Sequence, residues 1–191
     1  YGTIAPPSPS AGIDVAANTQ YGASGWHSIT DTSQITHGDI VPFSNRGPGS
    51  TGQNGPDLAA NGGYGTGAEP INMMLVANGI DSLHAFGTWG GTSRSTPVAA
   101  GAMAVVFQAF KSKHERWPTW AEARAILKGG TRFSGYDTLT GGAGTVDEAG
   151  AARIAAGLNG VYALPDEWSA GGYRGTHHDS FANLVAPGET T

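Results

Sequence analysis

The feature that most constrains this chain is a serine placed just before a long apolar run. Residues 91–97 read GTSRSTP, and residues 98–107 continue as VAAGAMAVVF. Because this run is apolar nearly all round, it predicts a buried helix over about residues 93–111. Gly101 inside the run predicts close packing against a neighbouring element. A helix start leaves backbone N–H groups free and carries a positive dipole end, so Ser93 is a candidate nucleophile.

Composition and charge limit the class of protein. The 191 residues include 31 Gly and 11 Pro, and only 13% are charged, which predicts one loop-rich α/β or β domain rather than disorder. A net charge of −5 without a basic stripe argues against a nucleic-acid partner. No apolar stretch reaches the roughly 18–20 residues that a membrane span needs. The chain has no cysteine, which excludes disulfides, thiol catalysis and cysteine metal ligands.

Hydrophobic patterning and turn residues predict an alternation of short strands and helices. The expected strands are residues 13–17, 41–44, 57–63 and 71–76. A second helix is expected from Thr119 to Lys128, stopped by two glycines, and a third over residues 146–156. Residues 77–92 and 131–145 are expected to be loops.

A serine alone is a weak nucleophile and needs a base. The chain has six histidines that could supply one: His27, His37, His84, His114, His177 and His178. His84 lies nine residues before Ser93 in a Gly-rich stretch, where a surface or substrate-groove residue is the favoured interpretation. The plain alternative for Ser93 itself is that it caps the helix, the commonest role of a serine at that place.

Several motifs together resemble the subtilisin-like serine proteases, the subtilase family. Residues 91–97 match the family's nucleophile motif Gly-Thr-Ser-x-(Ser/Ala)-x-Pro at every fixed position. Three more segments are similar to family motifs and follow in the family's order: residues 43–48 (FSNRGP), 55–62 (GPDLAANG) and 142–147 (GAGTVD). The resemblance covers about residues 9–157. It implies an α/β fold, with part of a doubly wound, mostly parallel sheet and a central buried helix starting at the nucleophile.

The resemblance also implies roles for the residues around the serine. Ser93 would be the nucleophile of a serine endopeptidase, and its backbone N–H would face the developing oxyanion. Gly90 and Gly91 would let the substrate backbone come close, because neither has a Cβ. Thr92 would hold the loop by a local hydrogen bond. Arg94 would either contact the leaving-group side or pack toward solvent.

The chain departs from the family pattern in what precedes the serine. The subtilase triad runs in the order Asp, His, Ser, and the family's Asp, His and oxyanion Asn motifs would all lie upstream of Tyr1. Residues 174–177 (RGTH) echo the family's His motif, but the base position holds Arg174, which is no base at neutral pH. We therefore expect residues 1–157 to be the C-terminal portion of a catalytic domain and residues 158–191 to be a tail leading toward a possible further β domain.

The resemblance also implies partners and a location for the protein, and two alternative functions remain beside it. The partners would be the upstream segment carrying the Asp and His, and a protein or peptide substrate. The family implies an extracellular protein that needs no cofactor, although Asp14, Asp31 and Asp39 could contribute to a structural calcium site. One alternative is a catalytically silent fragment with a structural or binding role. The other is a different hydrolase that pairs Ser93 with a local histidine such as His84.

Overall fold

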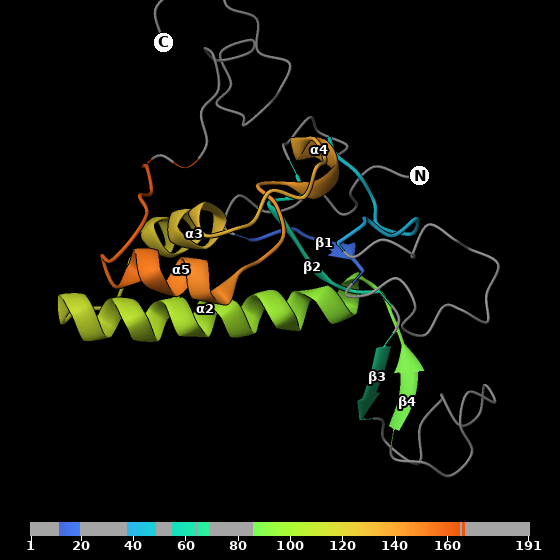
Figure 1. Cartoon of the computed structure of the whole chain (residues 1–191), viewed down its shortest axis with the longest axis horizontal. Helices are drawn as coiled ribbons and strands as arrows, with labels where there is room; N and C mark the ends of the chain where they lie inside the picture. The colour runs from blue at the N-terminus through green and yellow to red at the C-terminus, as the bar shows by residue number, and fades with distance from the viewer. Residues whose placement is uncertain are drawn as a thin grey trace, which may run out of the picture.

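The computed structural model describes residues 12–19, 38–48, 55–63, 65–68, 86–164 and 166. Its strands are β1 (Val15–Asn18), β2 (Leu58–Asn61), β3 (Gly65–Ala68) and β4 (Phe86–Trp89). Its helices are α2 (Thr92–His114), α3 (Trp120–Gly129), α4 (Thr138–Gly141) and α5 (Glu148–Ala155). Figure 1 shows α3 and α5 lying along the long helix α2, with β1 and β2 close to the end at which α2 begins.

A parallel pair of strands forms the sheet beside α2. β1 and β2 pair in parallel, from Val15 opposite Leu58 to Asn18 opposite Asn61. Small apolar side chains allow this close packing, and Leu58 and the alanines of both strands are buried. A parallel sheet with helices packed against it confirms the predicted α/β fold class. β3 and β4 form a separate antiparallel pair, from Gly65 opposite Trp89 to Ala68 opposite Phe86.

The helix predicted at residues 93–111 is α2, and it begins one residue earlier, at Thr92. Its buried residues recur every three to four positions: Ser95, Ala99, Ala102, Val106 and Phe110. This stripe faces β1, β2, α3 and α5, where it forms the main apolar core with side chains such as Leu58 and Ile126. The structure therefore places the core on one side of α2.

The opposite side of α2 is exposed in the described structure. Pro97, Gly101, Ala104 and Val105 follow one another along that side, and Val105 is 39% exposed. The expectation that α2 is buried on all sides is therefore not met by the described residues. A Cβ built on Gly101 would meet nothing within 4 Å, so the described residues show no close packing at Gly101. None of the described elements lies against this side of α2.

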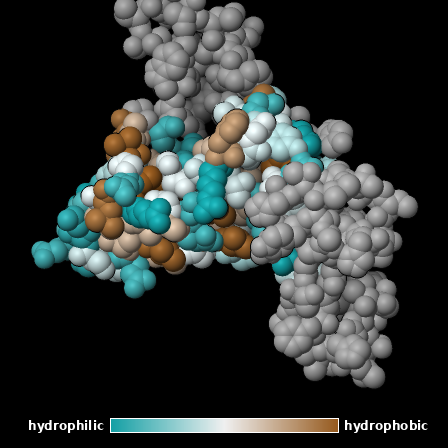
Figure 2. Space-filling model, viewed as in Figure 1, coloured by the Kyte–Doolittle hydropathy of each residue, from teal (hydrophilic) through white to brown (hydrophobic). Residues whose placement is uncertain are grey.

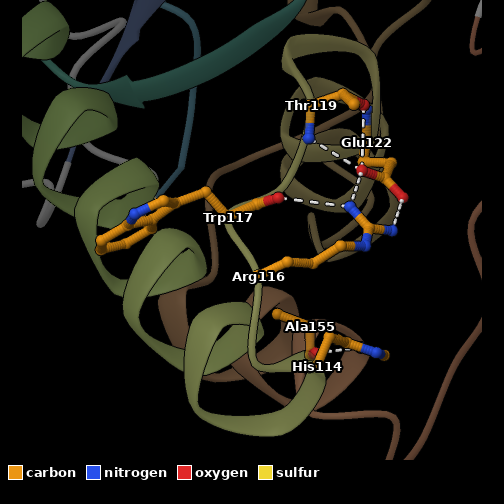
Figure 3. Close-up of polar contacts among 6 residues, drawn as sticks. All are labelled: His114, Arg116, Trp117, Thr119, Glu122 and Ala155. Carbon is orange, nitrogen blue, oxygen red and sulfur yellow. Dashed lines mark hydrogen bonds and ion pairs between the residues drawn. The ribbon is translucent and has the colours of Figure 1, made fainter.

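The two shorter predicted helices begin at caps that the sequence encodes. At the start of α3, the Thr119 hydroxyl accepts the N–H of Glu122, and Glu122 accepts the Thr119 N–H at 2.8 Å. Arg116 adds a two-pronged contact to the same carboxylate, at 2.6 and 2.9 Å (Figure 3). At the start of α5, Asp147 accepts the N–H groups of the next turn. Both helices are thus confirmed, with their ends shifted by one or two residues.

Some predicted elements differ from the structure. Residues 41–44 form a turn rather than a strand, because the Val41 N–H donates to the Ala17 carbonyl while the Ser44 hydroxyl accepts the Ala17 N–H. The Ser44 hydroxyl thus takes the place of the backbone carbonyl that a neighbouring strand would offer to the Ala17 N–H. β4 and α4 lie in segments expected to be loops. The strand predicted at residues 71–76 and the tail after residue 166 lie outside the described residues.

A cluster of charges connects the beginning of β2 to α3. One oxygen of Asp57 accepts the Asp14 N–H at 2.7 Å, and the other lies 2.7 Å from Arg124 and 3.4 Å from Lys128. The carboxylate side chain is only 7% exposed, so these partners offset the cost of burying its charge. Asp57 therefore has a structural role, joining the segment before β1 to α3. None of the described helices is long and apolar enough to cross a lipid bilayer.

Candidate active site

Ser93 is the second residue of α2, and its side chain is exposed to solvent. Gly91 caps the helix without a side chain, and its φ of 146° lies in a region that favours glycine. The Gly91 carbonyl accepts the N–H groups of Arg94 at 2.9 Å and of Ser95 at 3.4 Å. No hydrogen bond from the Ser93 N–H is found among the described residues. Within the described residues, the hydroxyl of Ser93 and a backbone N–H without a partner therefore lie together at the positive end of α2.

The ends of β1 and β2 hold the loop that leads to Ser93. The Asn18 carbonyl accepts the N–H groups of Gly62 and Gly63, at 3.0 and 2.9 Å. The Gly62 carbonyl then accepts the N–H of Gly91 at 2.8 Å. A Cβ on Gly62 would lie 2.1 Å from Ser95 Oγ and 2.7 Å from the Gly91 carbonyl oxygen. Only glycine at position 62 allows the helix start to come this close to the sheet.

Arg94 points back onto the same loop. Its Nη1 donates to the Gly63 carbonyl at 2.9 Å and lies 3.3 Å from the Trp89 carbonyl, while its guanidinium carbon lies 5.9 Å from the centroid of the Trp89 ring. Partial burial lowers the pKa of Arg94 from its ordinary value. No carboxylate partner of Arg94 is found in the described part of the chain. Arg94 thus joins the end of β4 to the turn after β2.

The remaining predicted site residues surround the serine. Gly90 and Gly91 form the short connection between β4 and α2, and Thr92 is the exposed first residue of the helix. The Thr92 carbonyl accepts the hydroxyl of Thr96 at 3.0 Å. A cavity of about 250 Å³ lies beside this first turn, lined by Thr92 and Thr96 and, across from them, by residues of the segments 13–16, 43–45 and Pro56.

The described residues place no base next to Ser93. His114 is the one histidine among them, and it ends α2, about 30 Å from Ser93 at 1.5 Å per residue. Its ring contacts Phe110, with centroids 4.2 Å apart, and lies 3.2 Å from the Ala155 carbonyl (Figure 3). His114 therefore packs the far end of the helix. The other five histidines lie outside the described residues, and so does the echo of the His motif at residues 174–177.

Two of the aspartates considered for calcium, Asp14 and Asp39, lie among the described residues. The Asp14 backbone binds Asp57, and Asp39 accepts the hydroxyl of Tyr136, which raises the pKa of that tyrosine. Asp31 lies outside the described residues. Within the described ranges, no group of three or more acidic or histidine side chains is arranged to hold a metal ion.

Sequence reasoning missed the residues that anchor the site. Asn18, Gly62 and Trp89 hold the serine loop through their backbone carbonyls, which no side-chain motif reveals. The pair of glycines at the end of the strand predicted at residues 57–63 was the one available signal, because adjacent glycines often mark a close approach of two backbones. Their partner at the start of α2 becomes visible only in the fold.

Comparisons with known proteins define the class. The family model described as the subtilase family matches residues 7–148, and the chain therefore belongs to the subtilase family. A lanthipeptide protease is similar in structure, with a TM-score of 0.56 and 18% identity, over 78% of this chain and 43% of that one. The self-cleaved protease domain of PatA has a TM-score of 0.54 and 21% identity, over 81% of this chain and 45% of that one.

A third similar structure is a protease from Pseudoalteromonas arctica PAMC 21717. It has a TM-score of 0.50 and 24% identity, over 79% of this chain and 38% of that one. At these identities the likeness shows the fold. The chain spans less than half of the length of each of these three structures. A comparison with curated proteins finds no match.

Proposed function

We propose that this chain is the C-terminal portion of the catalytic domain of a serine endopeptidase, with Ser93 as the nucleophile. The observation that carries the proposal is the exposed Ser93 at the start of α2, inside an intact nucleophile motif of the subtilase family. A capping role does not account for this serine, because no side-chain hydrogen bond caps α2 and Gly91 occupies the cap. The plain alternative for Ser93 thus loses its support.

In the proposed reaction the Ser93 oxygen attacks the carbonyl carbon of a peptide bond. A histidine takes the hydroxyl proton and passes it to the leaving amine as the C–N bond breaks, which leaves an acyl-enzyme that water hydrolyses. The N–H of Ser93 stabilises the oxyanion, aided by the positive end of α2. Gly90 and Gly91 leave space for the substrate backbone. Substrates would be proteins or peptides, and we propose an extracellular location on the family resemblance.

The histidine, its aspartate and the oxyanion asparagine would come from a segment upstream of this chain. Two features of the described structure support this part of the proposal. No base lies near Ser93 among the described residues, although the chemistry requires one. In addition, the exposed side of α2 carries an apolar stripe of Pro97, Ala104 and Val105. Exposing apolar surface to water costs free energy, so a covering segment would stabilise this side. Figure 2 shows other apolar residues on the described surface as well.

Peptide hydrolysis by the full-length protein tests the proposal. We expect Ser93→Ala to lower kcat/KM by at least about 10⁴-fold, because a triad without its nucleophile loses nearly all its catalysis. Ser112→Ala, an exposed serine near the other end of α2, is the matched control and should keep full activity. Hydrolysis that survives Ser93→Ala would contradict the proposal. No hydrolysis by the unmodified full-length protein would favour the catalytically silent alternative.

A further inference from the structure

We infer that Arg94 is a positioning residue that fixes the reactive geometry of Ser93 by clamping the two backbone segments that carry its loop. The inference rests on the proposed function of Ser93. Arg94 follows Ser93 directly in the chain, yet its guanidinium reaches the end of β4 and the turn after β2. These segments are separated by more than twenty residues of sequence, and the pairing of Gly65 with Trp89 brings them side by side.

The contacts form a closed arrangement around the loop. Arg94 Nη1 donates to the Gly63 carbonyl at 2.9 Å and lies 3.3 Å from the Trp89 carbonyl, so that one nitrogen bridges the two segments. In addition, the Gly91 N–H donates to the Gly62 carbonyl at 2.8 Å. The connection between Trp89 and Ser93 is thus attached to the turn after β2 at two points.

The positive charge of Arg94 strengthens its hydrogen bonds to the Gly63 and Trp89 carbonyl oxygens. Hydrogen bonds from a charged donor are shorter and stronger than those between neutral groups. Within the described ranges no carboxylate competes for the guanidinium, and the Trp89 ring lies beside it. A neutral side chain of similar length would fill the space but would not hold the carbonyl oxygens together.

The loop needs such a clamp because it contains two glycines. Gly90 and Gly91 give the substrate room, but glycine is also the residue with the most backbone freedom. A nucleophile that is displaced by about 1 Å loses about 100-fold in rate. Removing the clamp should therefore slow the attack of Ser93 far more than it weakens the binding of a ligand in the groove.

Inactivation of the full-length protein by a fluorophosphonate tests this inference. The concentration dependence of inactivation separates the rate constant of attack, kinact, from the binding constant, KI. For Arg94→Met we expect kinact to fall at least about 10-fold while KI changes less than about 3-fold. Arg94→Lys keeps a charged donor and should give an intermediate kinact. Arg116→Met is the matched control, because Arg116 braces the start of α3, and it should leave both constants unchanged.

Amide hydrogen exchange gives a readout that does not depend on activity. In Arg94→Met the peptide covering residues 89–95 should exchange faster, whereas a peptide from α5 should be unchanged. Unchanged exchange in residues 89–95, or a kinact equal to that of the unmodified protein, would overturn the inference. If Arg94→Met does not fold, the same measurements on Arg94→Gln decide in the same way. Failure of the unmodified protein to react at Ser93 would instead overturn the proposed function.

Discussion

At the scale of single residues, the closest approach in the site is that of Gly62 to the start of α2. A Cβ at this position would meet Ser95 Oγ at 2.1 Å, Ala17 Cβ at 2.6 Å and the Gly91 carbonyl oxygen at 2.7 Å. The Ala17 Cβ and the Gly91 carbonyl oxygen cannot rotate away, because neither is part of a flexible side chain. We expect Gly62→Ala to lower the free energy of unfolding by about 1–3 kcal/mol or more, measured by urea denaturation.

For the Ser95 side chain we expect the opposite effect of substitution on stability. This side chain is fully buried, and its hydroxyl has no hydrogen-bond partner among the described residues. A buried hydroxyl without a partner costs free energy, so Ser95→Ala should leave stability unchanged or raise it by up to about 1 kcal/mol. Ser95→Ala should also restore part of the stability lost in Gly62→Ala, because it removes the closest of the three contacts. A loss of more than about 1 kcal/mol in Ser95→Ala would show that the hydroxyl has a partner.

The sequence identifies some of these residues and not others, for a physical reason. Ser93 and its neighbours stand out because a nucleophile needs a particular side chain at a particular place in the chain. Arg94 did not reveal its contacts, because its partners are carbonyl oxygens, which every residue has. Which carbonyls lie within its reach depends on how β2, β4 and α2 meet in three dimensions.

At the scale of elements, the start of α3 predicts a defined response to acid. The Arg116 guanidinium and then the Thr119 backbone N–H lower the pKa of Glu122 from 4.5 to about 2. Since the folded pKa is below the unfolded one, this stabilisation is present above about pH 4.5 and is lost as the pH falls toward 2. The wild-type chain should thus lose stability over this range.

Glu122→Gln isolates this contribution. At neutral pH we expect it to lower the free energy of unfolding by about 1 kcal/mol, because the ion pair with Arg116 is lost while the capping box can still form. Measured between pH 4.5 and pH 2, the difference between Glu122→Gln and the wild type should shrink toward zero, since other carboxylates act equally in both. A difference that stays constant over this range would show that the carboxylate charge is not what stabilises α3.

The exposed side of α2 makes a prediction about the whole domain. If an upstream segment covers it, as we propose, Ala104→Glu in the full-length protein places an unpaired charge in an apolar contact. We expect a loss of several kcal/mol, by thermal or urea unfolding, and a loss of peptide hydrolysis. Ala149→Glu is the matched control, because Ala149 is exposed in the first turn of α5, where a negative charge is favourable. Equal stability of the two variants would contradict the proposed cover.

Sequence patterns predicted the helices better than the short strands. α3 and α5 carry their caps in the sequence, as Thr119 with Glu122 and as Asp147, so their starts could be predicted from local chemistry. β4 could not, because it has four residues and exists through its pairing with β3. The long apolar run predicted α2 correctly but not which side of it would be covered, since that depends on elements elsewhere.

At the scale of the whole molecule, the described residues hold the proposed nucleophile Ser93 and its loop, with no base beside it. The sheet, the packed side of α2 and the carbonyl contacts of Gly62, Gly63 and Trp89 place Ser93 at a fixed point in the fold. That arrangement is sufficient to present the serine, but not to activate it. The central claim is therefore that Ser93 reacts only when a segment from upstream supplies the base.

The most direct test is covalent labelling of Ser93, read out by intact mass and by mapping the labelled peptide. A fluorophosphonate probe is applied to the full-length protein, to its Ser93→Ala variant and to residues 1–191 alone. We predict one probe per molecule on Ser93 in the full-length protein, and no labelling of the other two samples. Absence of labelling in the full-length protein, or equally fast labelling of residues 1–191 alone, would contradict the account.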